Sequence, residues 1–478
     1  MTNHIQTIIL LTIFVPIVGS LTIPLAGLIS KRARSAWSVL LAAATSLFAM
    51  LLIPFALKGG ELVFRKTLTL GLDFVILADG LSVFMAAVSS SIGALIVVYS
   101  LGYMSHDDNQ SEYYLMVLLF IGAMMGLVFS ANLIFLYLFW EIAAIACWRL
   151  IGFYRQRDYV LKADKAFLIT FFGAVMMLLG FILIFNQTDT FDITAMRGVL
   201  IPGSAVALIL AGMFSKSATV PLHTWLPDAG VAPTTVTALL HAAVLVKIGV
   251  YAYARLFCGT FLLPPEWYKA IAVLVVFSSL VAAAAATMEN DLKRILAYST
   301  ISQIGYIFLG FSVLNPVGVS GSILFIFTHG LAKAGLFLCA GIVIHNTHQR
   351  DIRQLGGLIR TMPLTAVAFI FCAFSVIGIP PFGGFFSKLM VIVGTVKAGL
   401  IWVAALALFS AVLTMFYLFR VFSAVFLGEA KSHEKEGSRS MVWVVATLAI
   451  LSLLAGLFVS YPMKLVNVTS AEILRWLP

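Results

Sequence analysis

The chain has 478 residues, of which 62% are hydrophobic and only 10% are Asp, Glu, Lys or Arg. Soluble domains carry about 25% charged residues, so a soluble fold of this composition could not cover its surface with polar groups. The composition excludes a cytosolic globular enzyme, a disordered chain and a nucleic-acid-binding protein, despite a formal net charge of +10.

Apolar runs of about 18 residues or more recur from one end of the chain to the other, which is typical of membrane-spanning helices. Membrane strands would instead alternate apolar and polar residues. The sequence therefore predicts an all-α polytopic membrane protein, and its first run is too long for a signal-peptide core and is expected to be retained. Fourteen spans are predicted, near 5–29, 36–57, 78–101, 113–130, 132–153, 166–186, 200–220, 235–257, 270–288, 294–314, 317–345, 363–390, 398–427 and 440–460.

The loops between the spans predict one domain and its orientation. The longest polar stretch, 429–439, is only a loop, so 1–478 is predicted to be a single membrane domain. Loops after odd-numbered spans contain fifteen Lys or Arg residues, whereas loops after even-numbered spans and the C-terminal tail contain nine. Because Lys and Arg collect in cytoplasmic loops, both termini are predicted to lie outside.

Two spans contain both prolines and a lysine. Lys216, in Phe-Ser-Lys, precedes Pro221, and Lys388, again in Phe-Ser-Lys, follows Pro380 and Pro381. Proline breaks a helix, and in a bilayer such breaks persist where the freed carbonyls line a cavity or contact protein. Two broken helices five spans apart predict inverted five-helix repeats, with coincidence of three letters as the alternative. The predicted divisions are 1–110 for spans one to three, 111–260 for the first repeat, 268–428 for the second repeat, and 429–478 for a cytoplasmic loop and span fourteen.

Four lysines lie well inside the predicted spans. A lysine at the middle of a spanning helix costs roughly 2.5–3.5 kcal/mol on insertion scales, so four are not expected by accident. They should face the interior of the bundle, where they are hydrated or paired. A buried lysine can also gain and lose a proton, which makes it a candidate proton carrier. The four are Lys216, Lys247, Lys333 and Lys388.

Other polar residues extend this series. Glu141 in span five is the clearest intramembrane carboxylate, and it is either a modulated counter-ion or a plain helix-to-helix lock. His329 precedes Lys333 by four residues and shares its helix face. In a regular helix, His241 would lie about 240° from a residue six positions later, so Lys247 would not share its face. Each histidine, like Ser302, is compatible with helix packing as well as with a relay.

Taken together, these residues predict proton movement along the membrane interior. A solute transporter would need a shaped pocket with a few fixed polar contacts, and a structural anchor would need no buried lysines. The four cysteines, Cys147, Cys258, Cys339 and Cys372, form no CxxC pair, and no histidine cluster has metal-ligand spacing. No catalytic residue, metal or cofactor is therefore expected in this chain.

Several motifs together resemble one family. They are FWE at 139–141, KSATVPLHTWLPDAGVAPTTVTALLHAAVLVKIGVY at 216–251, DLKRILAYSTISQIGY at 291–306, THGLAKAGLF at 328–337 and GIPPFGGFFSKLM at 378–390. The chain resembles the antiporter-like subunits of respiratory complex I, of membrane-bound hydrogenases and of Mrp-type cation/proton antiporters. The resemblance covers about 110–425 and implies fourteen spans with two inverted five-helix repeats and broken helices in spans seven and twelve.

The resemblance implies a role for each matching residue. Glu141 and Lys216 would be a charge-coupling pair, Lys247 the central proton carrier, His329 and Lys333 the link between half-channels, and Lys388 the exit group. Arg149, two turns beyond Glu141, is not expected in the family, and whether it competes for that carboxylate is open. Residues expected to support the relay are His241, His223, Asp228, Ser302, Pro221, Pro380 and Pro381.

The resemblance also implies a setting. We expect a proton-translocating subunit of a redox-driven complex in a prokaryotic-type inner (cytoplasmic) membrane, with no redox centre of its own. Its partners would be other membrane subunits, lipid and a peripheral hydrogenase or quinone-oxidoreductase module. The alternative is a subunit of an Mrp-type Na⁺/H⁺ antiporter, and a stand-alone solute transporter ranks below both. H⁺ is the expected ion, and Na⁺ is left open. Because the chain stops after span fourteen, we expect no lateral helix and no extra C-terminal spans.

Overall fold

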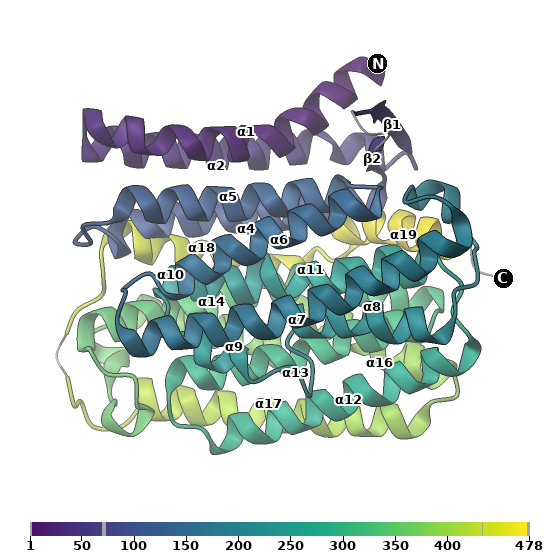
Figure 1. Cartoon of the computed structure of the whole chain (residues 1–478). Helices are drawn as coiled ribbons and strands as arrows, with labels where there is room; N and C mark the ends of the chain where they lie inside the picture. Colours follow the sequence, from purple (N-terminus) through teal and green to yellow (C-terminus); the bar gives the residue numbers. More distant parts are fainter. Residues whose placement is uncertain (1, 69–72, 433, 476–478) are drawn as a thin grey trace.

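The computed structural model describes residues 2–68, 73–432 and 434–475, which form a bundle of roughly parallel and antiparallel helices (Figure 1). A small two-stranded sheet lies at one end of the bundle. The helices and strands are α1 (Thr2–Ile29), α2 (Lys31–Leu51), α3 (Ile53–Ala56), β1 (Leu62–Thr67), β2 (Asp73–Ala78), α4 (Gly80–Tyr103), α5 (Gln110–Phe129), α6 (Leu133–Ile151), α7 (Arg157–Thr188), α8 (Gly203–Lys216), α9 (Trp225–Asp228), α10 (Thr234–Ala238), α11 (Leu245–Ala252), α12 (Pro265–Met288), α13 (Leu292–Ser312), α14 (Pro316–Thr347), α15 (Pro363–Ile377), α16 (Gly383–Lys397), α17 (Ile401–Phe426), α18 (Arg439–Leu457) and α19 (Ser460–Leu474).

Every predicted span coincides with helical structure. Twelve helical segments in the described part of the chain are long and apolar enough to cross a membrane. The other two predicted spans are interrupted. Span seven contains α8, which ends at Lys216 and is followed by turns, and span twelve is α15 and α16 separated by 378–382. Some boundaries were wrong, because α7 begins at Arg157 and continues unbroken to Thr188. Amphipathic first turns carry charged residues that a hydropathy pattern places in loops.

The strands and α19 were not predicted. β1 and β2 pair antiparallel, with Leu62 opposite Ala78 and Thr67 opposite Asp73, and Ile76 bridges to Ser130 in the turn between α5 and α6. A six-residue apolar run such as β2 cannot be assigned to a strand from its pattern alone. We call this side of the bundle the hairpin end.

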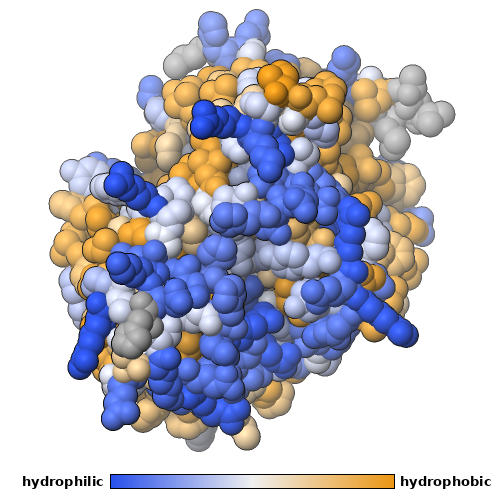
Figure 2. Space-filling model, turned by 90° about the vertical axis from the view of Figure 1, so that its left-hand side faces the viewer, coloured by the Kyte–Doolittle hydropathy of each residue, from blue (hydrophilic) through white to orange (hydrophobic). Residues whose placement is uncertain are grey.

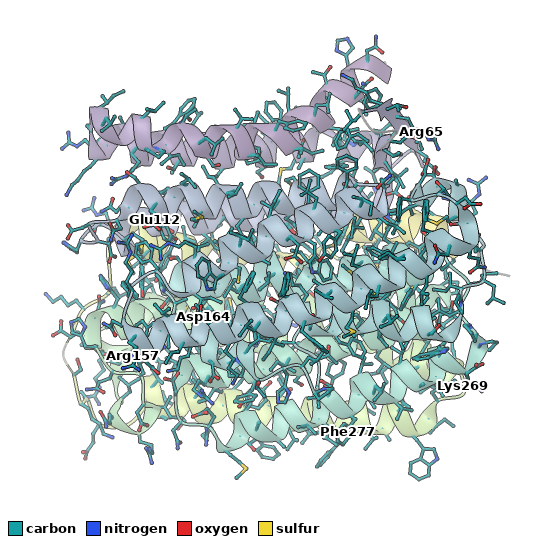
Figure 3. All side chains as sticks on the ribbon, viewed as in Figure 1. Arg65, Glu112, Arg157, Asp164, Lys269 and Phe277 are labelled. Carbon is teal, nitrogen blue, oxygen red and sulfur yellow. The ribbon has the colours of Figure 1, made fainter. Side chains whose placement is uncertain are left out.

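The opposite side of the bundle is the loop end. Figure 3 places Arg157 and Glu112 there, whereas Arg65 and Lys269 lie at the hairpin end. Figure 2 looks onto the loop end and shows hydrophilic residues gathered over it. Apolar side chains are exposed around the circumference instead, for example Phe277 on α12 and Trp402 on α17. This distribution is that of a protein whose sides contact lipid.

Two turns support the predicted inverted repeat. Asn132 caps α6 and bridges to Asp192, while Asp291 caps α13 and bridges to Asp351. Asp192 and Asp351 each accept a hydrogen bond from the N–H two residues later and open a short 3₁₀ helix. Two helices lie between the bridged residues of each pair. The second of them, α7 in one pair and α14 in the other, has 32 residues in both cases. Five crossings separate the two turns, so they lie at opposite ends of the bundle, as inversion requires.

The Phe-Ser-Lys match, however, does not mark equivalent positions. Lys216 is the last residue of α8 and comes before the break at Pro221. Lys388 lies in the second turn of α16 and comes after the break at Pro380 and Pro381. The shared Phe-Ser-Lys sequence is therefore a coincidence, since one lysine precedes the helix break in its span and the other follows it. The divisions at 111–260 and 268–428 stay predictions.

Candidate functional site

The four lysines named above are buried in the middle of the bundle, with relative exposures of 0–4%. They come from the two interrupted spans and from the segment Thr234–Cys258 and α14, whose most apolar windows are almost completely enclosed by protein. The expected placement of all four lysines inside the bundle is confirmed.

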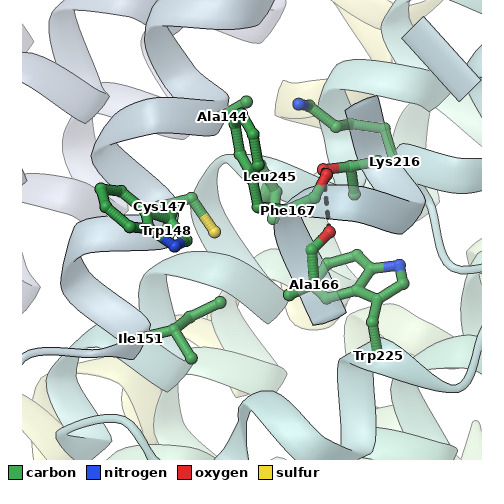
Figure 4. A pocket seen from close by; sticks show the side chains of 10 residues that line it. Ala144, Cys147, Trp148, Ile151, Ala166, Phe167, Lys216, Trp225 and Leu245 are labelled. Atoms are coloured by element: carbon green, nitrogen blue, oxygen red, sulfur yellow. Dashed lines mark hydrogen bonds between the residues drawn. The ribbon is translucent and has the colours of Figure 1, made fainter. Parts of the chain in front are cut away.

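Lys216 lies where α8 stops. Its position suits a cation, because the last carbonyls of a helix carry partial negative charge. Within the described residues, Nζ has no hydrogen-bond partner, and it lies 5.4 Å from the centre of the Trp140 ring. A small cavity adjoins this lysine. Lys216 and Trp225 lie on one side of it, and Cys147 of α6 lies on the other (Figure 4).

Glu141 lies next to Trp140 on α6, and its Oε1 atom is buried. Glu141 and Lys216 interact electrostatically. No ion pair between them within 4.0 Å is found in the part of the chain that the structure describes. The two charges thus face each other without direct contact, so neither is locked by the other.

Arg149 does not compete for Glu141. Its guanidinium donates to Glu112 Oε1, while Arg155 donates to the other oxygen of the same carboxylate at 2.8 Å. Glu112 lies in the first turn of α5, at the loop end. The sequence left open whether Arg149 competes for Glu141, and the structure shows that Arg149 binds this residue of another helix instead. The Glu141 carboxylate is left to Lys216.

Lys247 is placed by an irregular helix. The segments Leu239–Ala243 and Tyr253–Cys258 are π-helical, and Val244, between the first of them and α11, departs from helical dihedral angles. A π-bulge frees a backbone carbonyl from the regular ladder and is common at functional sites. Here the freed carbonyl is that of Ala242, which accepts a hydrogen bond from Lys247 Nζ.

Gly330 leaves room for the Lys247 ammonium. A Cβ atom at this position of α14 would lie 2.7 Å from Lys247 Nζ and 3.3 Å from the Ala242 oxygen. Only a residue without a side chain allows the lysine to approach the α14 backbone this closely. Because His329 immediately precedes Gly330 in the chain, the arrangement places Lys247 at the helix that carries His329.

His329 is the junction of the buried groups. It interacts electrostatically with Lys247, Lys333, Lys388 and His241. Its two ring nitrogens, although buried, have no hydrogen-bond partner among the residues that the structure places. A neutral imidazole has one N–H donor and one acceptor nitrogen, so His329 can present both functions to its charged neighbours.

Lys333 and Lys388 are each held by oxygen atoms. Lys333 Nζ donates to Ser299 Oγ at 2.6 Å and to the Leu296 carbonyl at 3.2 Å. Lys388 Nζ donates at 2.7 Å to the carbonyl of Val376, in the last turn of α15. The break after α15 leaves this carbonyl without a helical partner, so the prolines of span twelve create the site that binds Lys388. Lys388 also lies 4.8 Å from the centre of the Tyr306 ring.

Hydroxyl groups continue from Lys333 toward α17. Tyr417 donates to Ser299 Oγ at 2.7 Å and lies 3.3 Å from Thr414 Oγ1. Ser302 belongs to a second group, in which its Oγ atom lies 3.1 Å from those of Ser279 and Ser410. These three serines join α12, α13 and α17. Ser302 thus takes part in interhelical hydrogen bonding, and the direct partner of Lys333 is Ser299.

The other supporting residues divide into two groups. His241 is fully buried, stacks on Phe337 at 4.4 Å between ring centres and interacts electrostatically with Lys333. Asp228 instead joins an ion-pair cluster at the loop end, with Lys165 at 2.7 Å and Arg294 at 2.8 Å. His223 lies outside the relay, where its Nδ1 atom is 3.3 Å from the Pro221 carbonyl.

Comparison with known proteins identifies the chain. The sequence profile described as NADH:quinone oxidoreductase/Mrp antiporter, TM, matches residues 130–414. The chain belongs to this family. A second profile, NADH-Ubiquinone oxidoreductase (complex I), chain 5 N-terminus, matches residues 66–114 of the same antiporter-like chain. The resemblance predicted from the motifs is confirmed.

Individual relatives of this antiporter-family chain agree with the profiles. It is 33% identical to the Na(+)/H(+) antiporter subunit A1 of Staphylococcus aureus strain MRSA252, over 96% of this chain and 61% of that protein. The chain thus spans about three fifths of the length of this relative. The same fold occurs in the Mrp complex from Dietzia sp. DQ12-45-1b, with 24% identity, a TM-score of 0.88 and coverage of 98% and 97%. It also occurs in an archaeal membrane-bound sulfane sulfur reductase, with 23% identity, a TM-score of 0.88 and the same coverage.

One buried lysine of this family member was not predicted. Lys293 was assigned to a loop, but it is 4% exposed, and its Nζ atom donates to the Ala232 carbonyl at 2.9 Å. It also interacts electrostatically with His241. The sequence signal was its place in DLKRILAYSTISQIGY, whereas hydropathy alone put Lys293 outside the span. Lys293 lies in the first turn of α13, close to the loop end.

A buried ion pair at the hairpin end was also missed. Asp79 caps α4 and pairs with Arg255 through two hydrogen bonds, of 2.5 and 2.8 Å. Burial by itself would raise the pKa of Asp79, but the Arg255 guanidinium outweighs it and holds that pKa below its ordinary value. The two residues are 176 positions apart, so no local pattern could join them. As for metals, no group of three or more potential ligands was found in residues 2–68, 73–432 and 434–475.

Proposed function

We propose that this chain is a proton-translocating, antiporter-like subunit of a multi-subunit membrane complex. One observation carries the proposal: Lys247, Lys333 and Lys388 are buried within electrostatic range of a single histidine, His329, whose two ring nitrogens are open. Ionisable groups inside a membrane protein are costly, and a series of them marks a proton or ion pathway. A structural anchor would not need such a series of buried ionisable groups.

The geometry suggests how a signal would pass from Glu141 to the relay. Ser217, which follows Lys216, donates to the carbonyl of Val246 at 2.9 Å, and Val246 precedes Lys247. A change in the electrostatic interaction between Glu141 and Lys216 would therefore act on the helix that positions Lys247. Movement of the Lys247 ammonium from the Ala242 carbonyl toward the His329 imidazole would then transfer its proton to His329.

The second half of the path would run through α14. His329 and Lys333 share one face of this helix, and Lys388 lies within electrostatic range of both. We infer that protons leave through Lys388 and that Lys293, close to the loop end, lies on the entry side. From the distribution of Lys and Arg in the loops we infer a cytoplasmic loop end and both termini outside.

The energy for transport would come from partner subunits. We propose a redox-driven complex with a peripheral hydrogenase or quinone-oxidoreductase module. An Mrp-type complex is the second candidate, favoured by the 33% identity to an Na(+)/H(+) antiporter subunit. Proteoliposomes with the purified complex distinguish the two. Proton uptake driven by an electron donor supports the first, and uptake driven by an opposing Na⁺ gradient supports the second.

The same assay tests the relay. Proton uptake is measured for wild type, Lys247→Ala and Glu141→Ala, with Lys269→Ala, an exposed lysine at the hairpin end, as the control. We expect Lys247→Ala to abolish uptake, because Lys247 is the central carrier, and Glu141→Ala to lower it strongly. Wild-type uptake by both relay variants, in fully assembled complexes, would reject the relay.

A further inference from the structure

A small polar cavity lies at the hairpin end, where α19 meets the start of α4. It offers about 20 Å³ to the centre of a water molecule, and a site for one water needs roughly 10–15 Å³ by this measure. The charged residues that line it come from five different segments and are Glu61, Asp79, Arg197, Arg255 and Glu472. The cavity thus joins five charged side chains around the space of a single water.

Two of the three carboxylates at this cavity are paired with arginines. Arg255 donates to both oxygens of Asp79, and Arg197 Nη2 lies 2.8 Å from Glu61 Oε1. Glu472 forms no ion pair within 4.0 Å among the residues that the structure describes. The lining therefore has three carboxyl groups against two guanidinium groups, and one proton on Glu472 makes it neutral.

The Glu472 side chain is held by the backbone of α4. Its Oε2 atom accepts a hydrogen bond from the Gly80 N–H at 2.8 Å, whereas its Oε1 atom is buried and has no hydrogen-bond partner in the described part of the chain. A Cβ atom at Gly80 would lie 2.6 Å from Oε2 and 2.6 Å from Thr469 Oγ1, so this glycine allows α19 to dock closely on α4. A buried, charged oxygen without a partner is unfavourable, and protonation removes its charge.

The surroundings of Glu472 favour its protonated form. Burial and the neighbouring Asp79 carboxylate raise the pKa of Glu472 to about 7, although the Gly80 N–H and the Arg255 guanidinium act in the opposite direction. The charged groups around Glu472 are Glu61, Asp79, Arg197 and Arg255 at the cavity, with Lys58 and Arg475 in the adjoining hollow. Glu472 thus titrates near neutral pH, whereas an exposed carboxyl group would be ionised there.

We propose that Glu472 binds a proton from the solution at the hairpin end, and that this proton fastens α19 to the start of α4. Protonated Glu472 donates from Oε1 to a water in the cavity, and the water donates to Asp79 Oδ2, which has a further lone pair beside its bond from Arg255. Loss of the proton leaves two carboxylates on the same small cavity, and their repulsion loosens α19. This site is separate from the lysine relay, and the proposal does not depend on proton transport.

The direction of the pH effect follows from the two states of α19. Because the pKa of Glu472 is higher in the docked helix than its ordinary 4.5, docked α19 binds the proton more tightly than undocked α19 does. Docking is therefore strongest in acid and weakens as pH rises through about 7. From about pH 6 to about pH 8 the docking equilibrium constant should fall about tenfold.

Hydrogen–deuterium exchange in the assembled complex tests this site. Exchange of residues 460–474 is followed against pH and corrected for the intrinsic pH dependence of amide exchange. In the wild type, we expect exchange of this segment to rise about tenfold between about pH 6 and about pH 8. In Glu472→Gln, which resembles the protonated acid and does not titrate, exchange should stay at the low value of the acidic wild type. Glu266→Gln, which alters an exposed carboxyl group in the first turn of α12, should behave like the wild type.

A second variant and a salt comparison complete the test. Glu61→Gln removes a carboxylate that raises the pKa of Glu472 and leaves α19 unchanged, so the rise in exchange should shift to lower pH. An unshifted rise would show that a group other than Glu472 titrates. Exchange that is independent of pH in the wild type, or a rise that persists in Glu472→Gln, would overturn the proposal. At about pH 8, equal concentrations of NaCl and choline chloride should give the same exchange, and protection by NaCl alone would replace the proton site by a Na⁺ site.

Discussion

Replacing Gly330 by alanine tests the relay without removing any ionisable group. The new Cβ atom would lie 2.7 Å from Lys247 Nζ and 2.7 Å from the Ile92 side-chain tip. Ile92 borders an apolar groove between α2, α4 and α19, and its side chain has space to rotate into it. The Lys247 ammonium must move as well. Because it donates to the Ala242 carbonyl, moving away from the new methyl group weakens that hydrogen bond.

The magnitude of the loss in proton uptake follows from the hydrogen bond that Lys247 gives up. A hydrogen bond from a charged group contributes about 1.5–3 kcal/mol, so its loss alters the proton-transfer equilibrium at Lys247 by roughly one to two powers of ten. We expect proton uptake to fall at least about tenfold. Folding should survive, because glycine to alanine within a helix is by itself favourable by about 1 kcal/mol.

The assay is proton uptake by vesicles that contain the assembled complex. Gly93→Ala is the matched control, since its Cβ would approach only the Ile121 side-chain tip, at 2.9 Å. The double variant Gly330→Ala with Lys247→Ala should be no worse than Lys247→Ala alone, because both changes disable one group. Wild-type uptake by Gly330→Ala at normal assembly would refute the placement of Lys247 as a carrier.

Three other predictions concern ion pairs. Asp79→Ala should lower the free energy of unfolding by about 3–5 kcal/mol, because it leaves the Arg255 charge buried and unpaired. Thermal unfolding of the purified complex measures this loss, which should be smaller when both residues are replaced by leucine. Because the pKa of Asp79 is held below its ordinary 3.8, the contribution of this pair to the free energy of unfolding should be complete above about pH 4 and lost as pH falls through the lowered pKa. Unfolding measured against pH should show this loss of stability in acid, and Asp79→Asn should remove it. Arg149→Ala should leave proton uptake within about twofold of wild type, since Arg149 binds Glu112; a tenfold loss would show that Arg149 acts on the relay.

Sequence alone determined the approximate spans and found the four lysines buried in the middle of the bundle. Both are local properties: a long apolar run has no soluble alternative, and a lysine within such a run stands out because its burial is costly. For the same reason Lys216, Lys247, Lys333 and Lys388 were found, whereas Lys293, at the edge of a run, was assigned to a loop. The family resemblance added the proposed order of proton transfer among these lysines.

Tertiary structure decided which groups meet. The π-bulge before Lys247 changed the angular relation to His241 that a regular helix implies, and the partner of Arg149 came from α5. The pair Asp79–Arg255 joins segments that are 176 positions apart in the chain. Such contacts depend on how helices pack, and hydrophobic periodicity specifies which face of a helix is buried but not which residue of another helix it meets.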